Sequence, residues 1–406
     1  MEMVEELLQK YPEVLDYHKG GKLQITPKSA LKNQKDLSLA YTPGVAVPCK
    51  VIEADPMKAW DYTSKGNLVA VISNGTAVLG LGSIGAIAGK PVMEGKSVLF
   101  KSFANVDAID IEVDEKDPDK FIDIVRAIAP TFGGINLEDI KAPECFYIEE
   151  RLKELLDIPL MHDDQHGTAI ISAAALLNAA ELINKKLEDL KVVVLGAGAA
   201  AISCSRIYRQ LGVKNFVMFD SKGALAPSRK DLDANKREFV CDREYASYKE
   251  ALTGADVVLG LSKADLITGE DIKGMNRDPM VFAMSNPIPE IMPEVAKAAR
   301  PDVIMATGRS DFPNQINNVL GFPYIFKGAL KVRATKINEE MKIAAAKALA
   351  ELAKLPVPAE LSKIHARELA YGKEYLVPSP FDKRLDEFVS TAVAKAAISS
   401  GVARVK

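Results

Sequence analysis

The sequence predicts an α/β protein with two domains and a helical tail, and three observations lead to this prediction. The chain has 406 residues, which suits two domains at roughly 100–200 residues each. Short apolar runs alternate with helical patterns in its second half. Its first half also mixes strands and helices, but long loops rich in Gly and Pro separate them. We expect an N-terminal α/β domain over residues 1–160, a doubly wound parallel-sheet domain over 161–380, and a C-terminal helical tail over 381–406.

The second domain has the clearest strand pattern. Short β-branched runs predict strands at 191–195, 216–219, 256–259, 279–283 and 302–305. Helical patterns occur at 200–210 and 292–299. Strands that alternate with helices form an open parallel sheet covered on both faces, and right-handed crossovers make such a sheet doubly wound.

The first domain and the tail are less regular. In the first domain we expect strands at 68–72, 98–103 and 108–113, and helices at 3–10, 118–128 and 146–156. The domain boundary is expected between residues 158 and 166. Beyond residue 323 the chain becomes Ala-rich and helical, at 331–355 and 383–399. We expect these helices to pack on the second domain, and the last one is also a candidate oligomer interface.

Composition and charge exclude several classes of protein. The chain carries 52 Lys and Arg against 55 Asp and Glu, a formal net charge of −3, which disfavours a dedicated nucleic-acid or anionic-membrane binder. No run reaches the ~20 apolar residues of a spanning helix, and the acidic start MEMVEELLQK does not resemble a signal peptide. The cysteines, Cys49, Cys145, Cys204 and Cys241, have no paired spacing and are expected to be reduced thiols. We therefore expect a cytoplasmic protein that binds neither nucleic acid nor membrane.

A glycine-rich turn after the first strand of the second domain predicts a dinucleotide site. The segment LGAGAAAIS has the pattern G-x-G-x-x-A, with Gly196, Gly198 and Ala201 at the small positions. The first glycine permits a tight turn, the second lets the backbone approach a pyrophosphate, and the small third residue lets helix and strand pack closely. Ala199 and Ala200 open the following helix, whose free N–H groups would face the phosphates. The second domain is therefore predicted to be of the Rossmann type.

Asp220 is the candidate for binding the ribose of this cofactor. It ends the next strand, 24 positions after Gly196, near the spacing of about 20 expected for a ribose-binding carboxylate. Its charge would repel a 2′-phosphate and therefore favours NAD. Ser221 and Lys222 follow it directly, and because their hydroxyl and ammonium groups could hold that phosphate, NADP stays possible.

Two acidic pairs are candidate metal ligands. Glu138 and Asp139 lie in GGINLEDIKAPECF, and Asp163 and Asp164 lie in PLMHDDQHGTAI, each pair beside apolar residues. A buried carboxylate needs a partner, and Mg²⁺ or Mn²⁺ prefers oxygen ligands. The residue types alone leave open a simpler interpretation, in which the acidic pairs cap or salt-bridge surface helices.

Two other polar groups have simpler explanations. Acidic and apolar residues alternate over 107–114, which is typical of a half-buried strand with a polar face. His162 and His166 have the spacing of helical zinc ligands. We expect Asp164 to precede the helix, however, so that the two histidines do not share a helical face.

Taken together, these motifs resemble the malic enzyme family in its shorter prokaryotic form. The matching segments follow the family's order: LAYTPGVA around Tyr41, LGLGSIG followed by EGK at Lys96, INLED, HDDQHGTA, the glycine-rich turn, SNP at Asn286, and the paired Asn317–Asn318 before GFPYIFKG. They extend from residue 41 to residue 328, and the tail PSPFDKRL is also similar. The resemblance depends on the order and spacing of the motifs, because no single motif decides it.

The resemblance implies catalytic and metal-binding roles. Lys96 would be the catalytic base and Tyr41 the catalytic acid. Glu138, Asp139 and Asp164 would hold Mg²⁺ or Mn²⁺. The base would need a pKa lowered from about 10.4 toward about 7–8.

The resemblance also implies substrate contacts and a homodimer. Asn286 and Asn318 would hold the substrate carboxylate. Asn286 follows a strand at the edge where such sheets bind ligands, so it would also border the cofactor. Larger members of the family carry an Arg shortly before LGLG that meets this carboxylate, and SNGTAVLGLG has none. What replaces that Arg stays open.

The implied reaction is the oxidative decarboxylation of (S)-malate to pyruvate and CO₂, with reduction of NAD⁺ or NADP⁺. Malolactic chemistry, which converts malate to lactate on a retained nicotinamide, is the nearest alternative. An amino-acid dehydrogenase would not require the metal ligands. A non-catalytic nucleotide-binding sensor would require neither those ligands nor an acid and a base.

Overall fold

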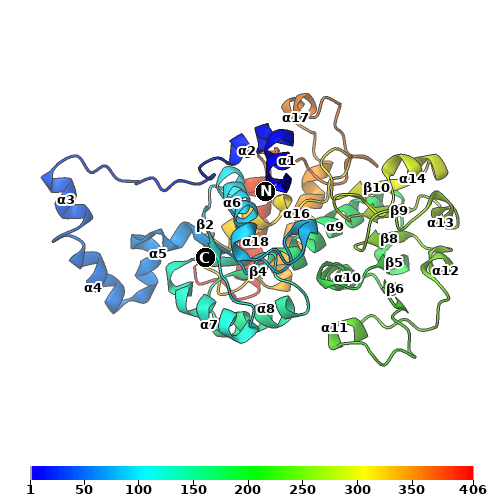
Figure 1. Ribbon diagram of the computed structural model, residues 1–406, viewed down its shortest axis with the longest axis horizontal. Coiled ribbons are helices and arrows are strands. Elements are labelled where there is room, and N and C mark those ends of the chain that lie inside the picture. Colours follow the sequence, from blue (N-terminus) through cyan, green and yellow to red (C-terminus); the bar gives the residue numbers. More distant parts are fainter. Residues whose placement is uncertain (1, 406) are drawn as a thin grey trace.

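The structure, a computed structural model, describes residues 2–405 and contains two β-sheets (Figure 1). The first has four strands in the order β2-β1-β3-β4, and the second has six in the order β10-β9-β8-β5-β6-β7. Only β6 and β7 pair in an antiparallel manner among the described strands. Because parallel strands need helical crossovers, helices cover the sheets. The chain is therefore the α/β protein that its sequence predicts.

The first sheet brings distant parts of the N-terminal half together. Its strands are β1 (Leu68–Ser73), β2 (Asp107–Glu112), β3 (Gly134–Leu137) and β4 (Leu160–His162), and its connecting helices are α6 (Ala86–Ala104), α7 (Pro118–Ile128) and α8 (Glu144–Leu155). The sequence does not predict β3 and β4, because runs of four and three residues are too short to show a strand period. The domain boundary predicted at residue 160 lies inside β4.

The strand predicted at 98–103 is wrong, because these residues form the last turns of α6. Met93, Ser97, Phe100 and Ala104 are fully buried, and their separations of three or four residues place them on one helical face. A short apolar run fits a buried helix as well as a strand. Only the longer pattern, which includes residues before position 98, separates the two.

The second sheet confirms the strands predicted for it to within two residues. It consists of β5 (Lys191–Leu195), β6 (Asn215–Asp220), β7 (Gly223–Ala224), β8 (Val257–Gly260), β9 (Met280–Ala283) and β10 (Ile304–Thr307). The helices α10 (Ala199–Leu211) and α14 (Pro293–Ala299) confirm the two that were predicted. The shorter helices α11 (Ala234–Arg237), α12 (Tyr248–Leu252) and α13 (Gly269–Lys273) lie in the connections.

The long helix α9 (Asp163–Leu182) links the two sheets. It starts directly after β4 and packs against α10 and α16 (Glu339–Lys354). The buried side chain of Asn178 donates hydrogen bonds to the carbonyl oxygens of Ala350, at 2.9 Å, and Leu376, at 2.8 Å. These bonds tie α9 to the C-terminal part of the chain.

The C-terminal segment is helical, as predicted. α15 (Phe322–Lys331) and α18 (Leu385–Ser399) pack on each other, and α18 also packs on α16. The shorter α17 (Ala359–Ile364) follows α16. The helix predicted at 331–355 starts eight residues too early, because α16 begins only at Glu339.

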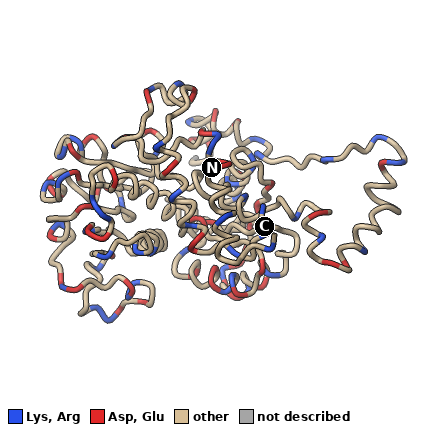
Figure 2. The backbone as a smooth tube through the Cα atoms, turned by 180° about the vertical axis from the view of Figure 1, so that it is seen from behind, with Lys and Arg blue, Asp and Glu red and all other residues tan. Residues whose placement is uncertain are grey.

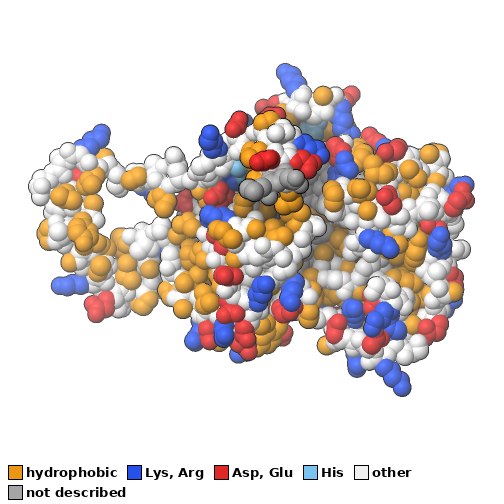
Figure 3. All heavy atoms as spheres, in the orientation of Figure 1, with side chains coloured by type: hydrophobic (Ala, Val, Ile, Leu, Met, Phe, Trp, Pro, Cys, Tyr) orange, Lys and Arg blue, Asp and Glu red, His pale blue; other side chains and the backbone are white. Residues whose placement is uncertain are grey.

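The N-terminal part of the chain includes an arm that projects from the body (Figure 1). After α1 (Glu2–Lys10) and α2 (Pro12–His18), the arm carries α3 (Gln34–Ala40) and α4 (Ala46–Ala54), neither of which buries a residue. Exposed apolar side chains cover it (Figure 3); Leu39 is 67% and Val47 66% exposed. The chain returns to the body at α5 (Ala59–Tyr62), where Trp60 is buried.

Charged residues of both signs are interspersed along the chain (Figure 2). Within residues 2–405, no helix combines the length and the apolar character needed to cross a membrane.

Candidate active site

Three carboxylates meet at the carboxyl edge of the first sheet. Glu138 and Asp139 follow β3 directly, and Asp164 lies in the first turn of α9, directly after β4. Because β3 and β4 are adjacent and parallel, their ends bring these residues together. Ligand oxygens of the three side chains lie within 4.8 Å of one another. Asp164 is therefore part of the helix, which corrects the expectation that it precedes it.

This acidic cluster suits a hard divalent cation. Glu138 and Asp139 are each 4% exposed, and Asp139 Oδ2 is buried without a hydrogen-bond partner among the described residues. Burial raises the pKa of Glu138 well above its ordinary value. Burial and the charge of Asp164 raise the pKa of Asp139 to about 7. Mg²⁺ or Mn²⁺ would stabilise such a set of oxygen ligands, so the residues fit the expected cation.

Lys96 places one positive charge beside the cluster. It lies on α6, with Nζ 2.7 Å from Asp163 Oδ2, 2.9 Å from Glu138 Oε1 and 4.5 Å from the centre of the Phe322 ring. Burial lowers the pKa of Lys96, but the charges of Asp163 and Glu138 outweigh burial and raise it above its ordinary value. The pKa of Lys96 is thus shifted upward, whereas the role of a base leads us to expect a lowered pKa.

The sequence marks Asp163 only as a member of an acidic pair, and the resemblance assigns it no role, yet it is a site residue. Its side chain is fully buried; Oδ2 binds Lys96, and Oδ1 has no hydrogen-bond partner within residues 2–405. A Cβ at Gly167 would lie 2.4 Å from Asp163 Oδ1, so only glycine fits there without a shift. The motif HDDQHG contained this signal. Asp163 is a second carboxylate beside Asp164, and Gly167, one helical turn later, has no side chain.

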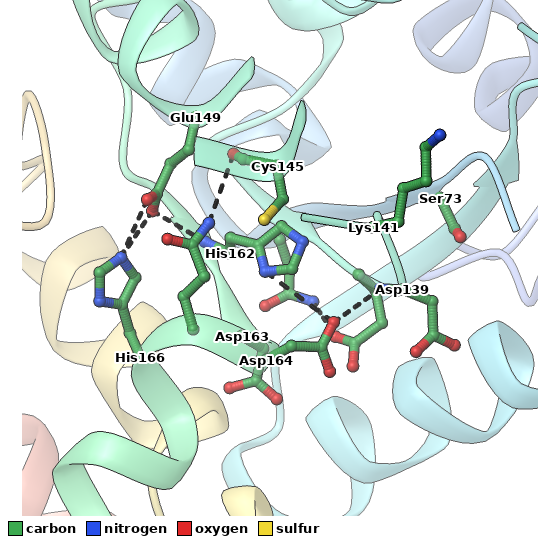
Figure 4. A network of polar contacts seen from close by, with 12 residues as sticks. Ser73, Asp139, Lys141, Cys145, Glu149, His162, Asp163, Asp164 and His166 are labelled. Atoms are coloured by element: carbon green, nitrogen blue, oxygen red, sulfur yellow. Dashed lines mark hydrogen bonds and ion pairs between the residues drawn. The ribbon is translucent and has the colours of Figure 1, made fainter. Parts of the chain in front are cut away.

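His162 and His166 do not join the acidic cluster. Among the residues that the structure describes, the only group of potential ligands with metal spacing is Glu138, Asp139 and Asp164. The ring of His162 is buried and lies 3.8 Å from Asp164 Oδ2. His166 instead contacts Glu149 on α8, at 2.9 Å (Figure 4). The spacing of the two histidines therefore does not mark a zinc site.

A cavity of about 500 Å³ extends from the cluster to the second domain. It is lined by Lys96, Glu138, Asp139 and Asp164, and also by Ala199, Ala200, Asn286 and Asn318. A Cβ at Gly308 would lie 2.6 Å from Asn286 Nδ2, so this glycine leaves room for the amide. The hydroxyl of Thr168 donates to Asn318 Oδ1 at 3.0 Å. One cavity thus contains the predicted base, cation ligands and carboxylate-binding residues.

Tyr41 lies outside this cavity. It follows α3 on the projecting arm and is 67% exposed (Figure 1). Within one chain, the structure does not bring Tyr41 to Lys96.

The glycine-rich turn lies between β5 and α10, as predicted. Gly196 has a φ of 113°, and a Cβ there would lie 2.3 Å from the carbonyl oxygen of Leu261, so a side chain is excluded. A Cβ at Gly198 would meet open space, and Gly198 lines a second cavity, of about 590 Å³. Ala201 lies on the buried face of α10 and belongs to the core. This geometry suits a pyrophosphate at the start of α10.

Asp220 lines the same cavity, but its carboxylate already has cationic partners. Arg229 Nη2 lies 3.0 Å and Lys236 Nζ 3.2 Å from Asp220 Oδ2, and the N–H of Lys222 donates to Oδ1 at 2.9 Å. Burial raises the pKa of Asp220, but these hydrogen bonds outweigh it and lower the pKa to about 2. The carboxylate is therefore ionised, with its charge compensated. The spacing from Gly196 could not reveal these partners.

Comparison with known proteins assigns both halves of the chain to one family. Residues 20–153 match the family model described as malic enzyme, N-terminal domain, and residues 165–364 match the one described as malic enzyme, NAD binding domain. The chain belongs to the malic enzyme family. The resemblance carried by the motifs is thereby confirmed.

Individual malic enzymes are similar over nearly the whole chain. The NADP-dependent malic enzyme of Escherichia coli (strain K12) is 56% identical over 96% of this chain and 52% of that protein. The NAD-dependent malic enzyme of Rhizobium meliloti (strain 1021) is 52% identical over 95% of this chain and 51% of that protein. The chain spans about half the length of these curated relatives. The malic enzyme of Pyrococcus horikoshii has the same fold, with a TM-score of 0.89 and 46% identity over 97% of this chain and 92% of that one.

The raised pKa of Asp139 predicts how cation binding depends on pH. Below this pKa a proton occupies the carboxylate and must leave before a cation binds, so the affinity for Mn²⁺ should rise as the pH rises through about 7. Calorimetric titration with Mn²⁺ alone, at a series of pH values, measures this. Asp139→Asn should bind Mn²⁺ weakly and with less dependence on pH. A wild-type affinity that stays constant from about pH 6 to about pH 8 would contradict the prediction.

Proposed function

We propose that the protein catalyses the oxidative decarboxylation of (S)-malate to pyruvate and CO₂, with a divalent cation and reduction of NAD⁺ or NADP⁺. The observation that carries this proposal is the single cavity that joins Lys96 and the acidic cluster to the start of α10. The names of the malic enzymes that the chain resembles support malate as the substrate. A bound Mg²⁺ or Mn²⁺ would polarise the oxygens of the substrate and stabilise the negative charge that develops as CO₂ leaves.

Lys96 is the residue proposed to accept the proton of the carbon-2 hydroxyl. It lines the same cavity as the acidic cluster, so a hydroxyl bound at the cluster lies near Nζ. Glu138 and Asp164, once they share their charge with a cation, would raise the pKa of Lys96 less, while Asp163 continues to raise it. The ammonium then loses its proton more readily and becomes a base. Asn286 and Asn318, which line the same cavity, would orient the substrate carboxylates.

Substitution of Lys96 tests this role. Lys96→Ala is expected to slow malate oxidation by ~10²–10⁴-fold, the usual contribution of a general base, while NADP⁺ binding persists. Lys101→Ala is the matched control, because Lys101 lies on the same helix and pairs with Asp107 outside the cavity; it should keep its turnover. The assay follows the absorbance of the reduced nicotinamide with malate and Mn²⁺. Near wild-type turnover in Lys96→Ala would remove Lys96 from the role of base.

Product analysis in the same assay separates the proposal from its alternatives. Pyruvate in proportion to the reduced nicotinamide, and lost on addition of EDTA, supports the proposal. Lactate without net reduction would indicate malolactic chemistry. Full activity on an amino acid in the presence of EDTA would indicate an amino-acid dehydrogenase, and nucleotide binding without any turnover would indicate a sensor.

For the cofactor, the surroundings of Asp220 favour NADP⁺ over the NAD⁺ that its charge alone suggests. Arg229 and Lys236 compensate this carboxylate. Lys236 and Ser221 line the same cavity as Gly198 and are placed to bind a 2′-phosphate. The chain is similar to a malic enzyme named NADP-dependent and to one named NAD-dependent. We therefore assign the cofactor preference to these few side chains.

A lysine substitution tests this preference. Lys236→Ala should raise the KM for NADP⁺ by about tenfold, the loss expected for one hydrogen bond to a charged group, with little change in the KM for NAD⁺. Lys230→Ala is the control, since Lys230 is an exposed lysine shortly before α11, the helix that carries Lys236, and lies outside the cavity lining. Steady-state kinetics with both cofactors measure the effect. An equal change for NAD⁺ and NADP⁺ would contradict a contact with the 2′-phosphate.

A homodimer would complete the site. Tyr41 sits on an arm whose apolar side chains are exposed, and exposed apolar surface of this kind is typical of a protein interface. In a two-fold dimer each arm would pack on the body of the other chain. Tyr41 would then reach the partner's cavity, where it would protonate carbon 3 of the enol product.

Mixing of two inactive variants tests for shared sites. Lys96→Ala and Tyr41→Phe chains, once they have exchanged subunits, should regain turnover, because one site of each mixed dimer would contain both intact residues. A mixture of Lys96→Ala and Asp164→Asn is the control and should regain none, because both residues belong to the same cavity of one chain. Native mass spectrometry with one tagged partner verifies the exchange. Mixed dimers without regained turnover in the first mixture would contradict a shared site.

A further inference from the structure

Glu149 is a buried carboxylate that lies outside the acidic cluster. It comes from α8 and is 5% exposed. Its Oε1 accepts a hydrogen bond from the backbone N–H of His162 at 3.0 Å. His166 Nε2 lies 2.9 Å from Oε1 and 3.0 Å from Oε2. Figure 4 shows Glu149 reaching from its own helix to both histidines.

The other side of His166 fixes the direction of this contact. Lys342 Nζ, on α16, lies 3.2 Å from His166 Nδ1. Lys342 is 4% exposed. An ammonium group only donates hydrogen bonds, so Nδ1 accepts and the ring hydrogen is on Nε2. His166 therefore donates to Glu149, and the contacts form a chain from α16 through α9 to α8.

Glu149 thus holds α9 at two points that are one turn apart. Between His162 and His166 lie Asp163, which binds Lys96 at 2.7 Å, and Asp164, which belongs to the acidic cluster. The first contact holds the backbone directly before these two aspartates, and the second holds the side chain two residues after Asp164. A turn restrained at both ends has little freedom to move its carboxylates away from the cluster.

We propose that Glu149 is a positioning residue for the cation site: by holding the first turn of α9, it keeps Asp164 in the acidic cluster and Asp163 on Lys96. This inference depends on the proposed function, because it assumes that the cluster binds a divalent cation. Groups that orient metal ligands from behind commonly contribute 10-fold to ~100-fold to metal affinity.

Glu149 also has a partner that serves as a built-in control. Lys153, on the same helix, lies 2.8 Å from Oε1 and contacts neither aspartate. Lys153→Met would remove an ion pair of the same carboxylate and leave its two contacts with α9 in place. A role of Glu149 that is confined to the packing of α8 would make the two substitutions equivalent, whereas a positioning role would not.

The experiment measures Mn²⁺ binding to the full chain, with Mn²⁺ as the only ligand, from the electron paramagnetic resonance signal of free Mn²⁺. Glu149→Ala is expected to weaken Mn²⁺ binding by ~10–100-fold, while Lys153→Met stays within about twofold of wild type. NADP⁺ binding, followed by fluorescence, should be unchanged in both variants, which shows that the second domain is folded. Glu149→Gln keeps an acceptor for the His162 N–H but loses the charge that faces His166, so it should show an intermediate loss.

Wild-type Mn²⁺ affinity in Glu149→Ala would overturn the inference, as would an equal loss in Lys153→Met. If Glu149→Ala does not fold, Glu149→Gln decides, and wild-type affinity in that variant would overturn the inference. A wild-type protein that binds no Mn²⁺, or binds it as well after Asp164→Asn, would overturn the cation site itself. The two failures are therefore distinguishable.

Discussion

The burial of like charges at one edge of the first sheet is the constraint on which the rest of this structure depends. Glu138, Asp139, Asp163 and Asp164 lie together where two parallel strands end, and Lys96 is the cation that faces them. Three of these carboxylates are buried and Asp164 is partly exposed, and such a set beside one ammonium is stable only if protons or a cation compensate the remaining charge. The raised pKa values of Glu138, Asp139 and Lys96 express this imbalance. A divalent cation would relieve it, and the same charge would serve decarboxylation.

The surrounding chain is arranged to maintain this cluster and to place it near the second domain. α9 carries two of the carboxylates in its first turn and then runs on to pack against α10 and α16. The cluster and the start of α10 therefore line one cavity. Glycines provide the space: Gly167 beside Asp163, and Gly308 beside Asn286. Backbone packing sets these close contacts. The core, and not flexible loops, therefore holds the acidic cluster relative to the start of α10.

Two parts of the molecule show how an isolated residue can mislead. Asp220 has the position of a ribose-binding carboxylate, yet Arg229 and Lys236 change the charge that a cofactor would meet there. Tyr41 has the motif of a catalytic acid, yet it stands on an exposed arm away from Lys96. For Asp220, the missing information is a pair of cationic partners later in the chain. For Tyr41, it is the surface that a second chain would supply in the proposed dimer.

The sequence by itself determined the features that depend on local periodicity and short motifs. Five strands of the second sheet (all but β7), the turn at Gly196 and the helix over 118–128 depend on short local signals: runs of apolar residues, glycine, and a capped, amphipathic pattern. The order of the motifs also determined the family. Tertiary structure alone decided what depends on contacts between distant segments: that β3 and β4 are strands, that Asp163 binds Lys96, and that Glu149 holds the first turn of α9. The physical reason is that burial and charge pairing are properties of the assembled core, in which residues 67 positions apart, such as Lys96 and Asp163, come within 2.7 Å of each other.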